Sequence, residues 1–249
     1  MLVGQRSPGQ NGGMRNPPNP HYRHRFPAEL ISHAVWLYHI FSLSFRDVEL
    51  LLGERGVIVS YESVRQWCLK FGASFADKMR RRRPRPGDKW HLDEVFIRIK
   101  GELHFLWRAV DQDGIVLDIL VQSRRDAGAA KRFFRRLAKG LQYVPRVLIT
   151  DKLGSYGVAQ RKLLPDVEHR KSRYLNNRAE NSHRPTRRRE RQMQRFKSSQ
   201  QAQSFLTAHS FIYGHFRPRR HLMTAANYRT SRAAAFRAWR EETCARMAA

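Results

Sequence analysis

Apolar residues recur at steps of three and four positions in the first third of the chain, and this spacing predicts helices. The first predicted helix begins at Pro27, a residue that suits a first helical turn. Ser44 and Ser60 each precede another segment with the same spacing and can cap the helix that follows. Three short helices with a tight turn predict a helix-turn-helix whose third helix recognises DNA.

The polar side of the third predicted helix separates two interpretations of this region. A plain three-helix bundle that packs on its neighbour would show the same apolar spacing. Arg65, Gln66 and Lys70 fall on the outer side of the helix, where they are available to a partner. We therefore favour DNA binding over a purely structural bundle.

From residue 90 the pattern changes to alternation and short apolar runs, which predict strands. Strands are expected over 90–99, 102–110 and 115–121, and their short connections make them an antiparallel meander. A helix over 126–139 leads to a strand over 144–150, which should lie parallel to the first strand and beside it. The predicted fold class is α/β, a ribonuclease-H-like mixed sheet flanked by helices, with an N-terminal all-α helix-turn-helix domain.

The segment after the sheet is predicted to be mostly helical. A short strand is expected around residues 167–169, and Asn176 or Asn177 can cap a helix that Pro185 should kink. An amphipathic helix follows Ser199, and a last polar helix is expected over 225–246.

Asp93 fits this pattern least well, because it lies in a strand that is apolar on both faces. A buried carboxylate is costly unless a cation or hydrogen-bond donors meet it. Asp151 ends the neighbouring strand, where sites of open sheets form, and Glu180 lies near a helix start. Hard oxygen ligands from separate elements suit Mg²⁺ or Mn²⁺. Two such ions about 4 Å apart can bind the attacking and leaving oxygens of a phosphoryl transfer.

Each acid also has a structural interpretation. Asp93 would then be a satisfied structural acid, Asp151 a helix cap and Glu180 a solvated helix residue. Glu94 is the main rival of Asp93 as a ligand. Strand alternation points Glu94 to the opposite face, so we expect it to support the fold or the ligands from behind.

The charge balance restricts the class of partner. The chain has 48 Lys and Arg against 21 Asp and Glu, a net charge of +27 and a pI near 11.3. Such an excess implies a polyanion, most simply nucleic acid. No apolar run approaches a membrane span, and no membrane partner is expected. Cys68 and Cys244 are too few and too far apart for a zinc site or a disulfide framework, which fits a reducing cytosol.

These patterns divide the chain into five predicted parts. They are a disordered tail over 1–21, a helix-turn-helix domain over 22–79, a basic linker over 80–88, a ribonuclease-H-like domain over 89–221 and a helical tail over 222–249. The linker is rich in Arg and Pro, so it is expected to be extended and suits phosphate contact as well. The candidate DNA contacts are Arg65, Gln66, Lys70, Arg81, Arg82, Arg83, Lys152, His183, Arg184, Arg187, Arg188 and Arg191.

Several motifs together resemble those of bacterial insertion-sequence transposases of the DDE superfamily, in the family typified by insertion sequence six. They are Trp90-His-Leu-Asp93-Glu94 with Lys100-Gly101, Arg108-Ala-Val-Asp111, Ile149-Thr-Asp151-Lys152 and Tyr174-Leu-Asn176-Asn177-Arg-Ala-Glu180-Asn-Ser-His183. The basic run over 187–193, the segment 195–198 and the N-terminal helices also match. The resemblance covers residues 22–221.

The resemblance implies that Asp93, Asp151 and Glu180 form a catalytic triad that binds two Mg²⁺ or Mn²⁺ ions. Arg187 would be the family's basic residue seven positions after the Glu. The implied activity is binding of a mobile element's terminal inverted repeats, cleavage of its ends and joining of 3′-hydroxyls to target DNA. The resemblance also implies a homodimer in the synaptic complex and a cytoplasmic, nucleoid-associated location in a bacterium.

One departure concerns the spacing of the triad. Only 28 residues separate Asp151 from Glu180, fewer than in many relatives, but the preceding asparagines keep Glu180 as the choice. Two other function classes use the same fold. A DNA-binding regulator with a dead catalytic domain need not keep all three acids, and their joint presence disfavours it. A structure-specific nuclease would use the acids for hydrolysis alone, whereas the helix-turn-helix and the Arg-rich segments favour strand transfer.

Overall fold

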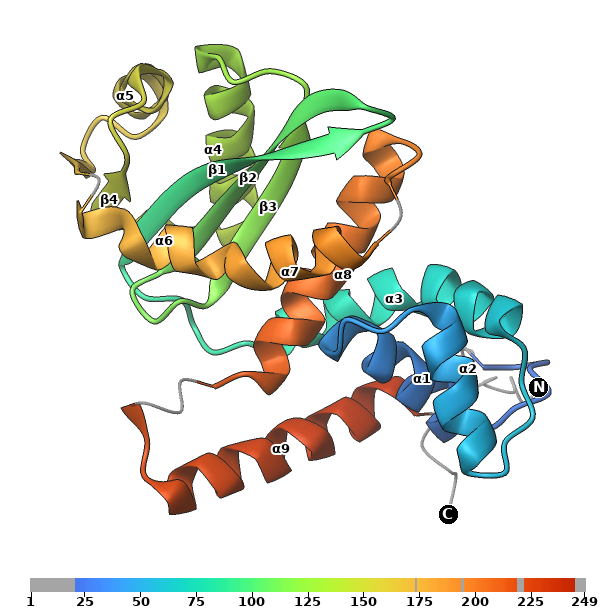
Figure 1. The fold of residues 1–249 in the computed structure, drawn as a ribbon. Helices are drawn as coiled ribbons and strands as arrows, with labels where there is room; N and C mark the ends of the chain where they lie inside the picture. The colour runs from blue at the N-terminus through green and yellow to red at the C-terminus, as the bar shows by residue number, and fades with distance from the viewer. Residues whose placement is uncertain (1–20, 173, 194, 219–221, 245–249) are drawn as a thin grey trace, which may run out of the picture.

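In the computed structural model the chain forms a mixed sheet with helices on both faces and a second group of helices beside it (Figure 1). The structure describes residues 21–172, 174–193, 195–218 and 222–244, so the predicted tail lies outside the described residues except at position 21. The strands are β1 (Lys89–Ile99), β2 (Glu102–Asp111), β3 (Val116–Gln122), β4 (Val147–Thr150) and β5 (Glu168–Lys171). The helices are α1 (Ala28–Ile40), α2 (Phe45–Glu54), α3 (Tyr61–Arg82), α4 (Ala127–Leu141), α5 (Gly154–Leu163), the 3-10 turn η1 (Tyr174–Asn176), α6 (Asn177–Ser182), α7 (Arg184–Gln192), α8 (Ser199–Phe216) and α9 (Ala225–Thr243). None of these described helices is long and apolar enough to cross a membrane.

The sheet has the predicted ribonuclease-H-like arrangement. Its strand order is β3-β2-β1-β4-β5, in which β1, β2 and β3 are antiparallel neighbours and β4 and β5 continue the sheet in parallel. β4 is buried along its whole length and pairs with the start of β1, where Leu92 lies opposite Thr150. Asp93 and Asp151 each follow these paired residues, which confirms that the crossover brings the two acids to neighbouring positions.

A hydrophobic core lies on each face of the sheet. On one face Leu92 of β1 and Trp107 of β2 pack with Phe133 of α4 and Tyr156 of α5. The other core comprises Ile97, Ile99, Leu106, Ile119 and Phe196 together with Ala202 and Leu206 from the first half of α8. On β1 and β2 the two cores take their residues from alternate positions, as the sequence pattern predicts.

The N-terminal helices share a third core with α8 and α9. It includes Ile31 of α1, Phe71 and Phe75 of α3, and Phe211 and Ile212 from the second half of α8. α8 therefore packs against the sheet at its start and against the helix-turn-helix at its end (Figure 1). The two parts of the protein are joined by a common helix as well as by the chain between them.

The caps of the N-terminal helices follow the prediction, but the end of the third helix does not. The Ser44 side chain accepts from the backbone of Asp47, which accepts in turn from the Ser44 backbone, and Ser60 caps α3. α3 continues to Arg82, so the prediction that an extended linker begins at residue 80 is wrong. The apolar spacing persists to Met79, and the helix end is held by ion pairs between Arg82 and two glutamates of α9.

The helix expected around Glu180 is broken in two, in keeping with the predicted kink at Pro185. α6 ends at Ser182, and Pro185 lies in the first turn of α7, where its missing N–H is tolerated. The expected side-chain cap by Asn176 is absent. Instead the Asn176 amide donates to the carbonyl of Leu92 at 2.8 Å, which ties the segment before Glu180 to β1.

Candidate active site

Three carboxylates converge where β1 and β4 end their pairing. Oxygens of Asp93, Glu94 and Asp151 lie within 4.8 Å of one another, which is close enough for a common metal ion. The Asp93 side chain is 13% exposed and that of Asp151 is 28% exposed, so both are partly accessible to solvent. The expectation that Glu94 points away from Asp93 is therefore only partly right, because its carboxylate approaches the other two.

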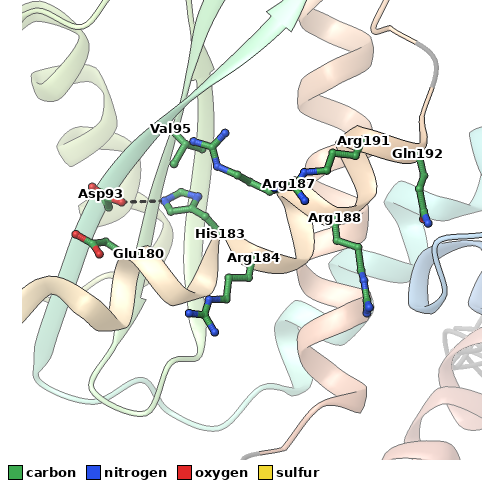
Figure 2. Close-up of a pocket in the computed structure, with 9 residues that line it drawn as sticks. All are labelled: Asp93, Val95, Glu180, His183, Arg184, Arg187, Arg188, Arg191 and Gln192. Carbon is green, nitrogen blue, oxygen red and sulfur yellow. Dashed lines mark ion pairs between the residues drawn. The ribbon is translucent and has the colours of Figure 1, made fainter.

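Glu180, on α6, lies beside Asp93, and both line one pocket (Figure 2). Its carboxylate does not belong to the group within 4.8 Å, and the residue is exposed. The pocket is lined by Asp93, Val95, Glu180, His183, Arg184, Arg187, Arg188, Arg191 and Gln192. One wall of the pocket is thus acidic and the other is a row of arginines.

The electrostatics of Asp93 indicate that the site suits a cation. Burial, together with the negative charges of Glu94, Asp151 and Glu180, raises the pKa of Asp93 to about 7. Like charges at this separation are unfavourable unless a positive charge lies among them. The donor set consists of carboxylate oxygens from separate elements, which is the chemistry that Mg²⁺ and Mn²⁺ prefer.

His183 lies beneath the pocket. Its side chain is 2% exposed, and its Nε2 is 3.5 Å from Oδ2 of Asp93 (Figure 2). Burial and the neighbouring arginines hold the pKa of His183 well below its usual range, so the ring is neutral and the contact is not a full ion pair. The prediction that His183 contacts DNA does not fit this burial. His183 lies between α6 and α7, where its ring points inward. The spacing of a continuous helix would instead place it on the same exposed side as Arg184 and Arg187.

Glu94 has both carboxylate oxygens engaged by other side chains. The hydroxyl of Tyr156 donates to Oε2 at 2.5 Å, and Nε of Arg125 donates to Oε1 at 2.5 Å. Burial raises the pKa of Glu94, while the donors from Tyr156 and Arg125 lower it. This arrangement agrees with the expected supporting role of Glu94. Sequence reasoning missed Tyr156 and Arg125, because nothing in the local pattern distinguishes them from a core tyrosine and a loop arginine.

The two oxygens of Asp151 have different surroundings. Oδ1 accepts from the backbone N–H of Leu153 at 2.9 Å, which fixes the carboxylate at the start of the loop after β4. Oδ2 is 3.6 Å from Nη2 of Arg125. The neighbouring Lys152 is exposed. Asp151 therefore has one oxygen fixed by the backbone and the other beside a cation.

Comparison with known proteins decides the family. Residues 87–219, more than half of the chain, match a family model described as a DDE domain. The chain is 36% identical over 166 residues to the transposase for insertion sequence-like element IS431mec of Staphylococcus aureus strain Mu50, a match that covers 64% of this chain and 73% of the relative. The chain belongs to the DDE transposases of the insertion sequence six family. The transposase for insertion sequence element IS257 in transposon Tn4003 of S. aureus is 35% identical to it over 166 residues, with the same coverage.

Solved structures resemble this transposase only distantly. The HTLV-2 integrase catalytic core domain in complex with magnesium, in its trimeric form, is 12% identical with a TM-score of 0.37, covering 57% of this chain and 91% of that one. The dimeric form is 18% identical with a TM-score of 0.33, covering 39% of this chain and 66% of that one. A chain of the simian T-cell lymphotropic virus intasome, in its complex with PP2A regulatory subunit B56 gamma, is 18% identical with a TM-score of 0.35. The match covers 41% of this chain and 39% of that one. The fold assignment rests on the strand order and pairing described above.

Arg108 fixes the helix junction of the transposase against the sheet. It lies on β2 directly opposite Asp93, and its side chain is buried. Its guanidinium donates to the carbonyl of Ser182 at 2.5 Å and to the hydroxyls of Thr186 and Ser210 at 2.9 and 2.7 Å. Burial lowers the pKa of Arg108 to about 10, so the group remains charged at neutral pH. The motif containing Arg108 was recognised in the sequence, but this anchoring role was not.

The predicted row of basic residues is present on one side of α7. Arg184, Arg187, Arg188 and Arg191 are exposed and line the pocket (Figure 2). Arg189 points the other way and is buried, with its guanidinium 4.2 Å from the ring centroid of Tyr38. The row continues from Glu180 across the helix break, so phosphates bound by the arginines would lie next to the acids.

Most of the other candidate DNA contacts already have partners within the chain. Arg65 and Gln66 both donate to the carboxylate of Glu62, and Lys70 lies 2.7 Å from a ring nitrogen of His24. In the predicted linker Arg82 is paired with Glu241 and Glu242, Arg83 donates to the carbonyls of Val116 and Leu117, and Arg81 is exposed. Contacts of these residues with DNA stay predictions, and Arg82 and Arg83 also hold the chain together.

Proposed function

We propose that this transposase cleaves the ends of its insertion sequence and joins the 3′-hydroxyls to target DNA at the site formed by Asp93, Asp151 and Glu180. The observation that carries the proposal is the pairing of an acidic wall with the arginine row of α7 in one pocket. Carboxylates alone would hold a cation, and arginines alone would hold a phosphate. Their combination suits a phosphodiester that must be bound while charge develops on its oxygens.

Asp93, Asp151 and Glu180 would hold two divalent ions, Mg²⁺ or Mn²⁺, in each active site. When bound, such ions activate the attacking oxygen and stabilise the charge on the leaving oxygen of an in-line transfer. The strands that carry Asp93 and Asp151 are buried and hydrogen-bonded, so they can hold the ligands rigidly. Asn176 and Arg108 fix the two ends of α6 and thereby place Glu180 over the same pocket.

The remaining residues of the pocket would position the DNA. Arg184, Arg187, Arg188 and Arg191 would bind backbone phosphates on the side of the pocket opposite the acids. Because the His183 ring is neutral, it does not compete with a metal ion for the negative charge of Asp93. Its role here is to pack against the Asp93 side chain and restrict its rotation.

The helix-turn-helix would recognise the terminal inverted repeats. Arg65, Gln66 and Lys70 lie on the outer side of α3, as a recognition helix requires. Glu62 already holds the Arg65 and Gln66 side chains in fixed directions, which lowers the entropy lost when they meet base edges. Because two element ends must be joined to one target, we propose that the chain acts as a homodimer in the synaptic complex.

The test uses duplexes that carry the element's own terminal repeat. We expect Asp93→Asn, Asp151→Asn and Glu180→Gln each to abolish Mg²⁺-dependent strand cleavage, while binding of the duplex in gel-shift assays is retained. Exposed Asp166→Asn is the matched control and should cleave like the wild type.

Three results would revise the proposal. Retained cleavage by Asp93→Asn or Asp151→Asn would overturn the site assignment. If Glu180→Gln cleaves and Glu94→Gln does not, Glu94 rather than Glu180 is the third ligand. Cleavage of ends by the wild type without any joining to target DNA would indicate a nuclease in place of a transposase reaction.

A further inference from the structure

Arg125 is a cation at the acidic cluster that the reaction described above does not use. It precedes the N-cap of α4, Asp126, whose side chain accepts from the backbone of Ala129, so the loop is fixed beside it. From there its guanidinium reaches Oε1 of Glu94 at 2.5 Å and Oδ2 of Asp151 at 3.6 Å. It thus spans from the supporting acid to a proposed metal ligand.

Glu94 acts as the fixed anchor of this arrangement. Its side chain is 1% exposed, and its second oxygen is held by the hydroxyl of Tyr156, which is itself fully buried. Each Glu94 oxygen gives one of its lone pairs to a donor, which makes the carboxylate a weaker ligand for an ion. The consequence is that Glu94 holds Arg125 next to Asp151.

Arg125 and a divalent ion would compete for the same oxygen. Oδ1 of Asp151 accepts from the Leu153 backbone, so Oδ2 has more lone-pair capacity for a cation, and Oδ2 is the oxygen that lies 3.6 Å from Nη2 of Arg125. A second positive charge at this distance opposes ion binding. Ion binding therefore requires that the guanidinium moves or that its charge is met by another anion.

A phosphate of bound DNA is the anion that fits. The Arg125 side chain is 37% exposed, and a guanidinium binds phosphate through two parallel hydrogen bonds. Under the proposed function, the phosphodiester to be cut must lie at the acids, within reach of this loop.

We propose that Arg125 serves as the counter-cation of Asp151 until a DNA phosphate draws it away, so that divalent ions bind tightly only together with DNA. This inference rests on the proposed function. By linkage, the factor by which DNA tightens ion binding equals the factor by which the ion tightens DNA binding. The arrangement would restrict the active ion-bound site to protein that already holds its substrate.

The test measures ion binding, with Mn²⁺ as the probe, on the full-length chain. Mn²⁺ is titrated by calorimetry and by electron paramagnetic resonance, with and without a short duplex, into the wild type and into Arg125→Gln. Without DNA we expect Arg125→Gln to bind Mn²⁺ about tenfold or more tightly than the wild type does, within the range usual for coupled sites. The duplex should tighten Mn²⁺ binding by the wild type and have a much smaller effect on Arg125→Gln.

Two further variants separate local competition from a change in overall charge. Arg124→Gln removes the same charge from the exposed adjacent residue and should bind Mn²⁺ like the wild type. The double variant Arg125→Gln with Glu94→Gln leaves the net charge of the cluster unchanged and leaves no unpaired carboxylate in the core. It should still bind Mn²⁺ more tightly than the wild type, and it serves as the test if Arg125→Gln alone does not fold.

The outcomes are distinguishable. Equal Mn²⁺ affinity for wild type and both Arg125 variants would overturn the counter-cation role. Equal tightening by Arg124→Gln would reduce the effect to overall charge and would overturn it as well. A wild type that binds Mn²⁺ equally with and without DNA would overturn the coupling to substrate. A wild type that binds no Mn²⁺ under either condition would instead overturn the proposed metal site.

Discussion

Replacing Asp93, the first of the proposed catalytic acids, should stabilise this protein at alkaline pH. The Asp93 carboxyl is surrounded by Glu94, Asp151 and Glu180, and burial together with these charges raises its pKa from 3.8 to about 7. Asp93→Asn keeps the size of the side chain, replaces one acceptor oxygen with an amide donor and removes one of the repelling charges. The free energy of unfolding of the variant should therefore exceed that of the wild type wherever Asp93 would be ionised.

The size of the effect follows from the pKa difference between the two states. Between pH 4 and pH 7 the unfolded chain has lost the Asp93 proton while the native protein keeps it, so stability falls as pH rises through this window. Each pKa unit corresponds to about 1.36 kcal/mol, which gives a ceiling of about 4 kcal/mol above pH 7. Because the side chain is 13% exposed and Arg125 lies nearby, we expect roughly half of this ceiling, ~2 kcal/mol.

Urea unfolding at pH 5 and pH 8 measures this difference. The advantage of Asp93→Asn should grow between the two pH values, and exposed Asp166→Asn should show no such growth. At pH 8, millimolar Mg²⁺ should stabilise the wild type more than the variant, since an ion that binds only the native state raises its stability. The reasoning is refuted if Asp93→Asn is no more stable than the wild type at pH 8, or if its advantage does not depend on pH.

Two other predictions concern the core and the arginine row. Ile212→Ala, in the half of α8 that packs on the N-terminal helices, should lower stability by roughly 2–5 kcal/mol. With fluorinated tryptophan, the ¹⁹F resonances of Trp67 and Trp107 should then be lost at the same reduced urea concentration; separate midpoints would mean that the two parts unfold independently. Arg187→Gln should weaken binding to any duplex and lower the slope of log affinity against log salt by about one, while Arg195→Gln, outside the pocket, should change neither if the pocket is the DNA site.

Those features of the site that depend on neighbouring residues or on chain topology could be predicted from the sequence. Ser44 and Ser60 cap their helices because capping needs only residues three positions apart. Asp93 and Asp151 lie close together because β4 pairs with β1 in parallel. The connection rules for a strand reached through a helix predict this position. Glu180 was identified from its motif, and it lines the same pocket as Asp93.

Features that depend on distant partners could not be predicted. Arg82 lies at the end of a long helix and is held there by Glu241 and Glu242, which are 159 and 160 positions away. Nothing near residue 82 in the sequence indicates these partners. Arg125 and Tyr156 look ordinary in the sequence, since their meaning comes from a shared contact with Glu94. A local sequence pattern predicts which face of an element a residue occupies. It does not predict which charged residue from a distant segment will contact that face.

Two buried arginines make the position of the arginine row depend on both halves of the molecule. Arg108 binds the α6–α7 junction from the sheet, and Arg189, on α7, donates to the carbonyls of Phe41 and Leu43 between α1 and α2. A buried guanidinium that meets only neutral oxygens is expensive to desolvate, and an apolar residue of similar size would avoid that cost. An apolar residue in place of Arg189 would also remove the hydrogen bonds between α7 and the helix-turn-helix. The buried charges therefore serve to orient α7. The helix that faces the acids is bound directly to the helices proposed to recognise the element's ends.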